Sequence, residues 1–98
     1  MSLPLTVAPE AEADLYQAYK SLQEARPGLG ARFNSAVAEV FERIEAAPEV
    51  YARIWEDVRA ARLKKLRYLV YYVIFDDRIE VIAVLHGSRD SSVWQSRH

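Results

Sequence analysis

Cysteine is absent from this chain, and its absence removes several kinds of chemistry at once. The 98 residues include no Cys, 3 Gly, 4 Pro, 1 Met and 2 His. Without cysteine the protein can form no disulfide, no thiol nucleophile and no cysteine-ligated metal site. The two histidines are His86 and the C-terminal His98, and they predict no metal site. We therefore expect neither a metal nor another cofactor.

Long apolar runs are also missing. No stretch approaches the ~20 apolar residues that a helix needs to cross a bilayer, and the N-terminus lacks the basic start and apolar core of a signal peptide. The composition, 51% hydrophobic and 28% charged, is typical of a globular protein. A length of 98 residues accommodates one core. We therefore expect a single cytoplasmic domain that spans residues 1–98.

Acidic and basic residues are unevenly distributed, although the net charge is only −1. Residues 1–50 carry eight acids and four bases, a net charge of −4, whereas residues 51–98 carry nine bases and six acids, a net charge of +3. Segment 59–67 holds five cations and no acid, namely Arg59, Arg62, Lys64, Lys65 and Arg67. This asymmetry indicates an acidic or polyanionic partner at one face, or alternatively a solvated strand and turn. The negative overall charge argues against binding of nucleic acid over a broad surface.

The first half of the chain has the periodicity of two helices. Pro9 marks the start of the first helix, and Glu10 and Glu12 suit the positive end of its dipole. Residues 26–30 interrupt the helical pattern, because proline and two glycines do not sustain a helix. A second amphipathic helix follows and ends at Pro48. Two helices with so short a connection predict an antiparallel hairpin.

Strand-type residues dominate the second half, and a short edge strand is also expected at residues 3–7. Residues 51–55 are ambiguous between loop and strand, and residues 58–63 predict a strand. Residues 66–75 and 79–86 are the clearest strands, because they are dense in Tyr, Val, Ile and Phe. The predicted order is β-α-α-β-β-β. This is an α+β fold in which a two-helix hairpin packs on one face of a mainly antiparallel sheet.

Asp76 and Asp77 suit a two-residue loop between the last two strands. Side chains alternate between the two faces of a strand, so one face of this strand pair is expected to point toward the helices. That face carries Leu66, Tyr68, Val70, Tyr72, Ile74, Ile79, Val81, Ala83 and Leu85. The other face carries Arg67, Leu69, Tyr71, Val73, Phe75, Glu80, Ile82, Val84 and His86. The same register pairs Arg67 with His86. No third helix is predicted to cover this second face, so we expect a homodimer mate or a segment of another chain to cover it.

Several motifs, taken in order, resemble the RelE/ParE superfamily of bacterial toxins. They are Val58-Arg59, Tyr71-Tyr72, the segment VIAVLHGSRD from Val81 to Asp90, and Trp94 with Arg97. The resemblance extends over essentially the whole chain. It implies the same α+β fold and a growth-inhibiting toxin of a type II toxin–antitoxin, or plasmid stabilisation, module. It also implies a cognate antitoxin as partner.

Two functional classes within the superfamily remain open. RelE-like members cleave mRNA on the ribosome, whereas ParE-like members inhibit DNA gyrase and are not known to cleave anything. In a RelE-like enzyme the catalytic candidates are Arg67, His86 and Arg89, since arginine can hold two phosphate oxygens and histidine can transfer a proton near neutral pH. The tail lacks the tyrosine that RelE-like nucleases commonly use, and Trp94 cannot transfer a proton.

We therefore expect a ParE-like toxin, not an enzyme, whose target is DNA gyrase. The alternatives are a ribosome-dependent mRNA endonuclease and a degenerate homologue that binds an antitoxin without being toxic. Contacts with the target or the antitoxin are expected from cations together with apolar and aromatic side chains, the composition of a protein-docking surface. These residues are Arg59, Arg62, Arg67, Leu69, Tyr71, Arg89, Trp94 and Arg97.

Overall fold

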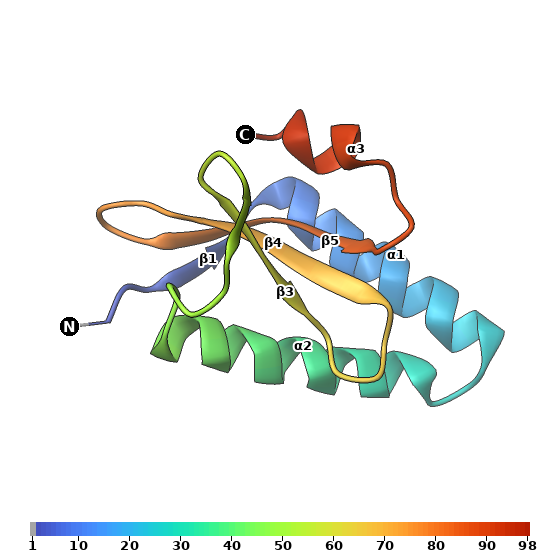
Figure 1. The fold of residues 1–98 in the computed structure, drawn as a ribbon. Helices are drawn as coiled ribbons and strands as arrows, with labels where there is room; N and C mark the ends of the chain where they lie inside the picture. Colours follow the sequence, from blue (N-terminus) through green and yellow to red (C-terminus); the bar gives the residue numbers. More distant parts are fainter. Residues whose placement is uncertain (1) are drawn as a thin grey trace.

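The computed structural model describes residues 2–98, in which five strands and three helices form one domain (Figure 1). The strands are β1 (Leu5–Val7), β2 (Arg53–Trp55), β3 (Val58–Arg62), β4 (Tyr68–Ile74) and β5 (Ile79–His86). The helices are α1 (Pro9–Ala25), α2 (Leu29–Ala46) and α3 (Ser91–Gln95). The predicted α+β fold is confirmed, and β2 and α3 extend the predicted order. Within the described residues no helix is long and apolar enough to span a membrane.

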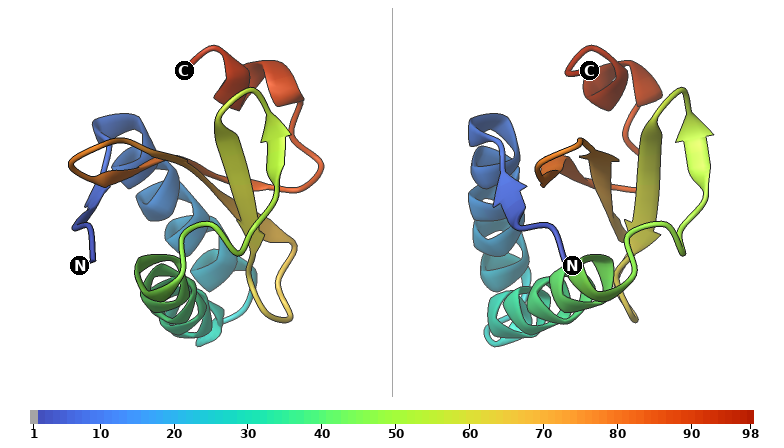
Figure 2. Two further views of the ribbon diagram at one scale, coloured as in Figure 1. Left: turned by 60° about the vertical axis from the view of Figure 1, so that its left-hand side comes forward. Right: turned by 90° about the vertical axis from the view of Figure 1, so that its left-hand side faces the viewer.

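All five strands belong to one sheet, in the order β1-β5-β4-β3-β2. β1 runs parallel to β5, and the other neighbours are antiparallel. The helix pair α1 and α2 covers one face, and the short α3 lies on the side of the sheet away from α2 (Figure 2). The buried apolar side chains accordingly form two cores, one on each face.

Gln23 closes the turn between α1 and α2. Its side-chain Oε1 accepts hydrogen bonds from the backbone N–H groups of Gly28 and Gly30, each at 3.1 Å. These N–H groups lie at the start of α2, where no helical carbonyl can accept from them. The turn itself needs glycine, since Gly28 has a φ of 94°. Position 30, inside α2, also favours glycine, because a Cβ there would approach the Cε2 atom of Tyr19 to 2.6 Å unless that ring moved.

The loop between β4 and β5 has the predicted two residues. The backbone N–H of Phe75 donates to the carbonyl of Arg78 at 2.8 Å, and Tyr72 lies opposite Val81. Near the loop the register is therefore the predicted one. A tight turn and the alternation of side chains fix it together.

A β-bulge then shifts the register by one residue. Ala83 takes the place opposite β4 that was predicted for Ile82, so Ile82 is the extra residue of β5. His86 consequently lies opposite Tyr68, and its predicted pairing with Arg67 is wrong. The alternating pattern does not reveal the bulge, because the residues on both sides of it are apolar.

The bulge also exchanges the faces of the last part of β5. Val84 packs in the core under the helices, whereas Ala83 and Leu85 pack in the core on the opposite face, which reverses the prediction for all three. His86 turns to the helix side, where its ring meets that of Tyr68 edge-on with 5.4 Å between centroids. The end of β5 therefore presents different side chains to the solvent from those that strict alternation predicts.

The second face of the sheet is covered by the chain itself. Trp94 of α3 stacks on Tyr71 with 4.8 Å between ring centroids and 15° between ring planes. Trp55 of β2 meets Trp94 edge-on at 6.0 Å. Tyr71 and Trp94 are each only 6% exposed. The expectation that a homodimer mate or another chain covers this face is therefore wrong, because α3 and β2 supply the cover.

An ion pair between α1 and the C-terminal tail closes the outer edge of β5. Asp14 accepts hydrogen bonds from Arg97 at 2.6 and 3.2 Å and from the backbone N–H of Val84 at 3.0 Å. Arg97 also donates to the carbonyl of Ile82 at 3.0 Å. Because β1 pairs with β5 only as far as Val81, these side chains satisfy backbone groups that have no neighbouring strand. Arg97 is thus part of the internal structure.

Truncation of Trp94 tests whether α3 is structural cover. Trp94→Ala should lower the free energy of unfolding by about 3 kcal/mol, because it leaves a cavity between Tyr71 and Trp55. Val50 is 73% exposed, so the control Val50→Ala should change that energy by less than about 0.5 kcal/mol. Urea unfolding measures both variants. Equal, small effects would show that Trp94 does not cover the sheet.

The Asp14–Arg97 pair should be coupled far more strongly than a surface pair. Its side chains are only 12% and 19% exposed, so a double-mutant cycle with alanine should give about 2 kcal/mol of coupling in the free energy of unfolding. The Glu39–Arg43 pair is the matched control, with side chains 51% and 52% exposed, and should give about 0.3–0.5 kcal/mol. A coupling no larger than that of the control would contradict the role assigned to Asp14 and Arg97.

Candidate functional site

Cations line a hollow where β3 ends, β4 begins and β5 ends. The hollow measures about 590 Å³, and we call it the strand-side hollow. Its lining residues are Arg62, Leu63, Lys65, Leu66, Arg67, Leu69, His86, Gly87 and Ser88. The lining includes three cations and no carboxylate, so the hollow favours an anionic group.

Backbone hydrogen bonds fix the turn of residues 63–67, which carries Lys65 and Arg67 and directly follows Arg62. The N–H of Leu63 donates to the carbonyl of Tyr68 at 3.0 Å, and the N–H of Gly87 donates to the carbonyl of Arg67 at 2.7 Å. Lys65 has a φ of 64°, in the left-handed region, which permits the chain to reverse here. The position of the cations therefore follows from the backbone of the β3–β4 turn.

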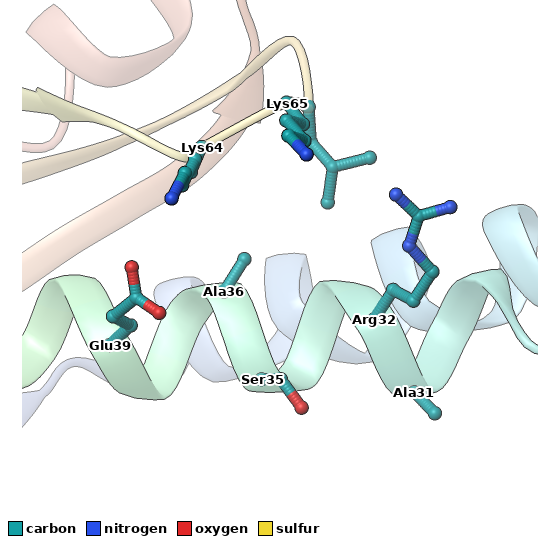
Figure 3. A pocket seen from close by; sticks show the side chains of 8 residues that line it. Ala31, Arg32, Ser35, Ala36, Glu39, Lys64 and Lys65 are labelled. Atoms are coloured by element: carbon teal, nitrogen blue, oxygen red, sulfur yellow. The ribbon is translucent and has the colours of Figure 1, made fainter.

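A second hollow lies on the other side of the same turn, against α2. It measures about 400 Å³, and we call it the helix-side hollow. Its lining residues are Ala31, Arg32, Ser35, Ala36, Glu39, Lys64, Lys65 and Leu66. Figure 3 shows the lysines reaching from the turn toward α2, and Arg32 extending from α2 toward the turn. The two hollows share Lys65 and Leu66.

Glu39 is the one acid of the helix-side hollow, and it already accepts a hydrogen bond from Arg43 at 2.8 Å. Lys64 and Lys65 line this hollow together because they lie in a turn, whereas on a strand neighbouring side chains would point to opposite faces. The charge pattern of the sequence does not point to Arg32, because this residue lies on α2, far along the chain from the basic segment. Only the packing of α2 beside the turn reveals it.

His86 borders the strand-side hollow with a fixed ring orientation. Its Nδ1 accepts a hydrogen bond from the backbone N–H of Ser88 at 3.1 Å and lies 2.8 Å from the Ser88 hydroxyl oxygen. A backbone N–H can only donate, so Nδ1 carries no proton and the neutral ring holds its proton on Nε2. His86 therefore offers a hydrogen-bond donor, which is again suited to an anion.

The structure separates the three residues that a RelE-like nuclease would use together. Arg67 and His86 line the strand-side hollow, with Arg62 and Leu69. Arg89 lines a different hollow of about 280 Å³ between α1 and the end of β5. His86 lines both hollows. Arg67 and Arg89 therefore do not converge on one hollow.

The remaining predicted contact residues make internal contacts. Arg59 lies at the far end of β3 and donates to the carbonyls of Tyr51 at 2.6 Å and Glu49 at 3.3 Å. This contact ties the loop before β2 to the sheet. Tyr71, Trp94 and Arg97 pack or pair within the fold, as described above. Within residues 2–98 no group of three His, Asp or Glu side chains is arranged to hold a metal ion.

Comparison with known proteins places this fold in a family. The family described as "ParE toxin of type II toxin-antitoxin system, parDE" matches residues 5–91. The chain belongs to the ParE toxin family. The match ends at the first residue of α3, so the two hollows lie within it, whereas Trp94 and Arg97 lie beyond it. The resemblance to the RelE/ParE superfamily is thereby confirmed, and the chain is a ParE-family toxin of a type II toxin–antitoxin system.

Individual ParE relatives agree with this placement. Toxin ParE2 of Mycobacterium tuberculosis, in strains CDC 1551 / Oshkosh and ATCC 25618 / H37Rv, is 33% identical over 97 residues, which cover 98% of this chain and 92% of that protein. A structure titled "Chromosomal ParDE TA system from P. aeruginosa" matches with a TM-score of 0.66 at 17% identity and covers 86% of this chain and 95% of that one. At that identity the structural match supports the fold.

The tautomer of His86 is open to direct measurement. Long-range ¹H–¹⁵N NMR spectra at mildly alkaline pH should show His86 with its proton on Nε2, because Nδ1 accepts from Ser88. The exposed His98 serves as an internal control and should show averaging between the two tautomers. A proton on Nδ1 of His86 would contradict the hydrogen bond with Ser88.

Proposed function

We propose that this ParE-family toxin inhibits DNA gyrase without cleaving nucleic acid, and that a ParD-type antitoxin holds it inactive. The observation that carries the proposal is the family match over residues 5–91, whose description names the paired parDE system. The 33% identity to Toxin ParE2 along nearly the whole chain supports the same assignment. Gyrase acts in the cytoplasm, and we place the action of the toxin there.

The geometry around His86 supports a mode of action without catalysis. General acid–base cleavage needs proton-transfer groups within reach of the same phosphate. Here Nδ1 of His86 is engaged by Ser88, Arg67 and Arg89 line different hollows, and the tail contains no tyrosine. Trp94, the aromatic residue of the tail, is buried against Tyr71.

One observation favours a second candidate function, ribosome-dependent mRNA cleavage. The strand-side hollow combines three cations with a histidine N–H donor, a lining that suits a phosphate group. A toxin of this kind would cut messages on translating ribosomes, and Arg67→Ala, which removes a cation of this hollow, would abolish the cuts. This outcome separates the second candidate from gyrase inhibition.

A supercoiling assay tests the proposed target. Gyrase should supercoil relaxed plasmid less and less as more purified toxin is added, because the toxin blocks the gyrase cycle. An equimolar amount of antitoxin should restore supercoiling, and relaxation by topoisomerase I, the control enzyme, should be unaffected. Unchanged supercoiling at saturating toxin would contradict the proposal. Normal growth when the toxin gene is expressed alone would indicate a homologue that has lost its toxicity.

A further inference from the structure

We propose that the β3–β4 turn, residues 63–67, is the docking site for an acidic amphipathic segment of the antitoxin. The segment would place carboxylates in the hollows on both sides of the turn and aliphatic side chains on the leucines between them. This inference rests on the proposed pairing with a ParD-type antitoxin. It adds the surface that the antitoxin covers and the chemistry of the segment that covers it.

Uncompensated positive charge is the first argument. Five cations line the two hollows, namely Arg32, Arg62, Lys64, Lys65 and Arg67. Within residues 2–98 none of the five is in an ion pair, and the carboxylate of Glu39 is already bonded to Arg43. Like charges that line two adjoining hollows repel one another, so an anionic partner would gain the attraction and reduce the repulsion.

Apolar surface between the cations is the second argument. Leu66 is half-buried and lines both hollows, Leu69 is half-buried in the strand-side hollow, and Ala36 is half-buried in the helix-side hollow. The segment from Arg62 to Arg67 thus consists of four cations and two leucines. A partner that matches this surface must carry aliphatic side chains as well as acids, which a protein segment does and a phosphate backbone does not.

The linings also argue against nucleic acid as the occupant. No Phe, Tyr or Trp side chain lines either hollow, so unpaired bases would find little stacking surface beyond the His86 ring. Residues 1–50, which include α1 and α2, have a net charge of −4, and a long polyanion that extended past the turn would be repelled by them. A short acidic segment avoids this repulsion because its charge is local. The antitoxin is the protein partner that the parDE description names.

Binding of the cognate antitoxin to charge variants of the toxin tests the proposal. The test variant is Arg62→Gln/Lys65→Gln/Arg67→Gln, in which three exposed cations of the turn and of the adjoining end of β3 are lost. The matched control is Lys20→Gln/Arg26→Gln/Arg53→Gln, which removes three exposed cations elsewhere and gives the same net charge. The test variant should bind the antitoxin about 10- to 100-fold more weakly, whereas the control should bind like the unmodified toxin.

Two further measurements keep the result interpretable. The conservative variant Arg62→Lys/Arg67→Lys should retain binding, since it keeps the charge, and thermal unfolding should confirm that all variants fold. Affinity of the unmodified toxin should fall between about 50 and about 300 mM salt, and the dependence should be shallower for the test variant.

Each other outcome is informative. Equal affinities of the test variant and the control would overturn the docking site and leave the pairing intact. Failure of the unmodified toxin to bind the antitoxin would overturn the proposed pairing itself, and this inference with it. A 20-base-pair duplex DNA that competes with the antitoxin at equal concentration would overturn the acidic segment in favour of nucleic acid.

Discussion

The Asp14–Arg97 ion pair is the interaction on which the arrangement of the C-terminal half depends. Asp14 lies on the first helix and Arg97 one residue before the C-terminus, yet their side chains meet at 2.6 Å. Together they bond the carbonyl of Ile82, the bulged residue of β5, and the N–H of Val84, two residues further along the strand. The bulge would otherwise expose unpaired backbone groups at a strand edge, which is costly and promotes aberrant strand pairing. The ion pair therefore makes the bulge tolerable and anchors the tail.

An anchored tail decides which surfaces the molecule can offer. With Arg97 held, α3 lies over the second face of the sheet and Trp94 stacks on Tyr71. A face that looks like a docking surface in the sequence is thus an interior. The exposed charged side chains that could bind a partner lie instead at the β3–β4 turn, where the cations of β3, the turn and α2 line two adjoining hollows. The bulge also changes the end of β5, because it pairs His86 with Tyr68 in place of Arg67.

The fold was predictable from the sequence because each of its main elements has a strong local signal. The helical periodicity, Pro9 and the Pro-Gly break specify the hairpin of α1 and α2, and the two aspartates specify the loop between β4 and β5. The bulge was not predictable, since a one-residue slip among Val81, Ile82, Ala83 and Val84 exchanges apolar residues for apolar residues. Periodicity cannot distinguish the two registers when both faces are buried.

The helix that covers the second face has only a weak signal in the sequence. Asp90 caps α3, and its Oδ1 accepts a hydrogen bond from the backbone N–H of Ser92 at 2.8 Å. That bond lowers the pKa of the Asp90 carboxyl. An aspartate such as Asp90 shortly before the apolar residues Val93 and Trp94 is typical of a helix start. A helix of five residues, however, has too few turns to show periodicity in the sequence. The candidate site was only partly predictable, because the cations of the turn are adjacent in sequence whereas Arg32 joins them through tertiary packing.

We propose that this toxin meets its antitoxin through the β3–β4 turn, while the tail remains internal structure. Hydrogen–deuterium exchange of the toxin, alone and with its antitoxin, tests this claim most directly. The account predicts slower amide exchange in residues 62–67 on complex formation and unchanged exchange in residues 90–97. The opposite pattern, with the turn unchanged and the tail either newly protected or released, would contradict it.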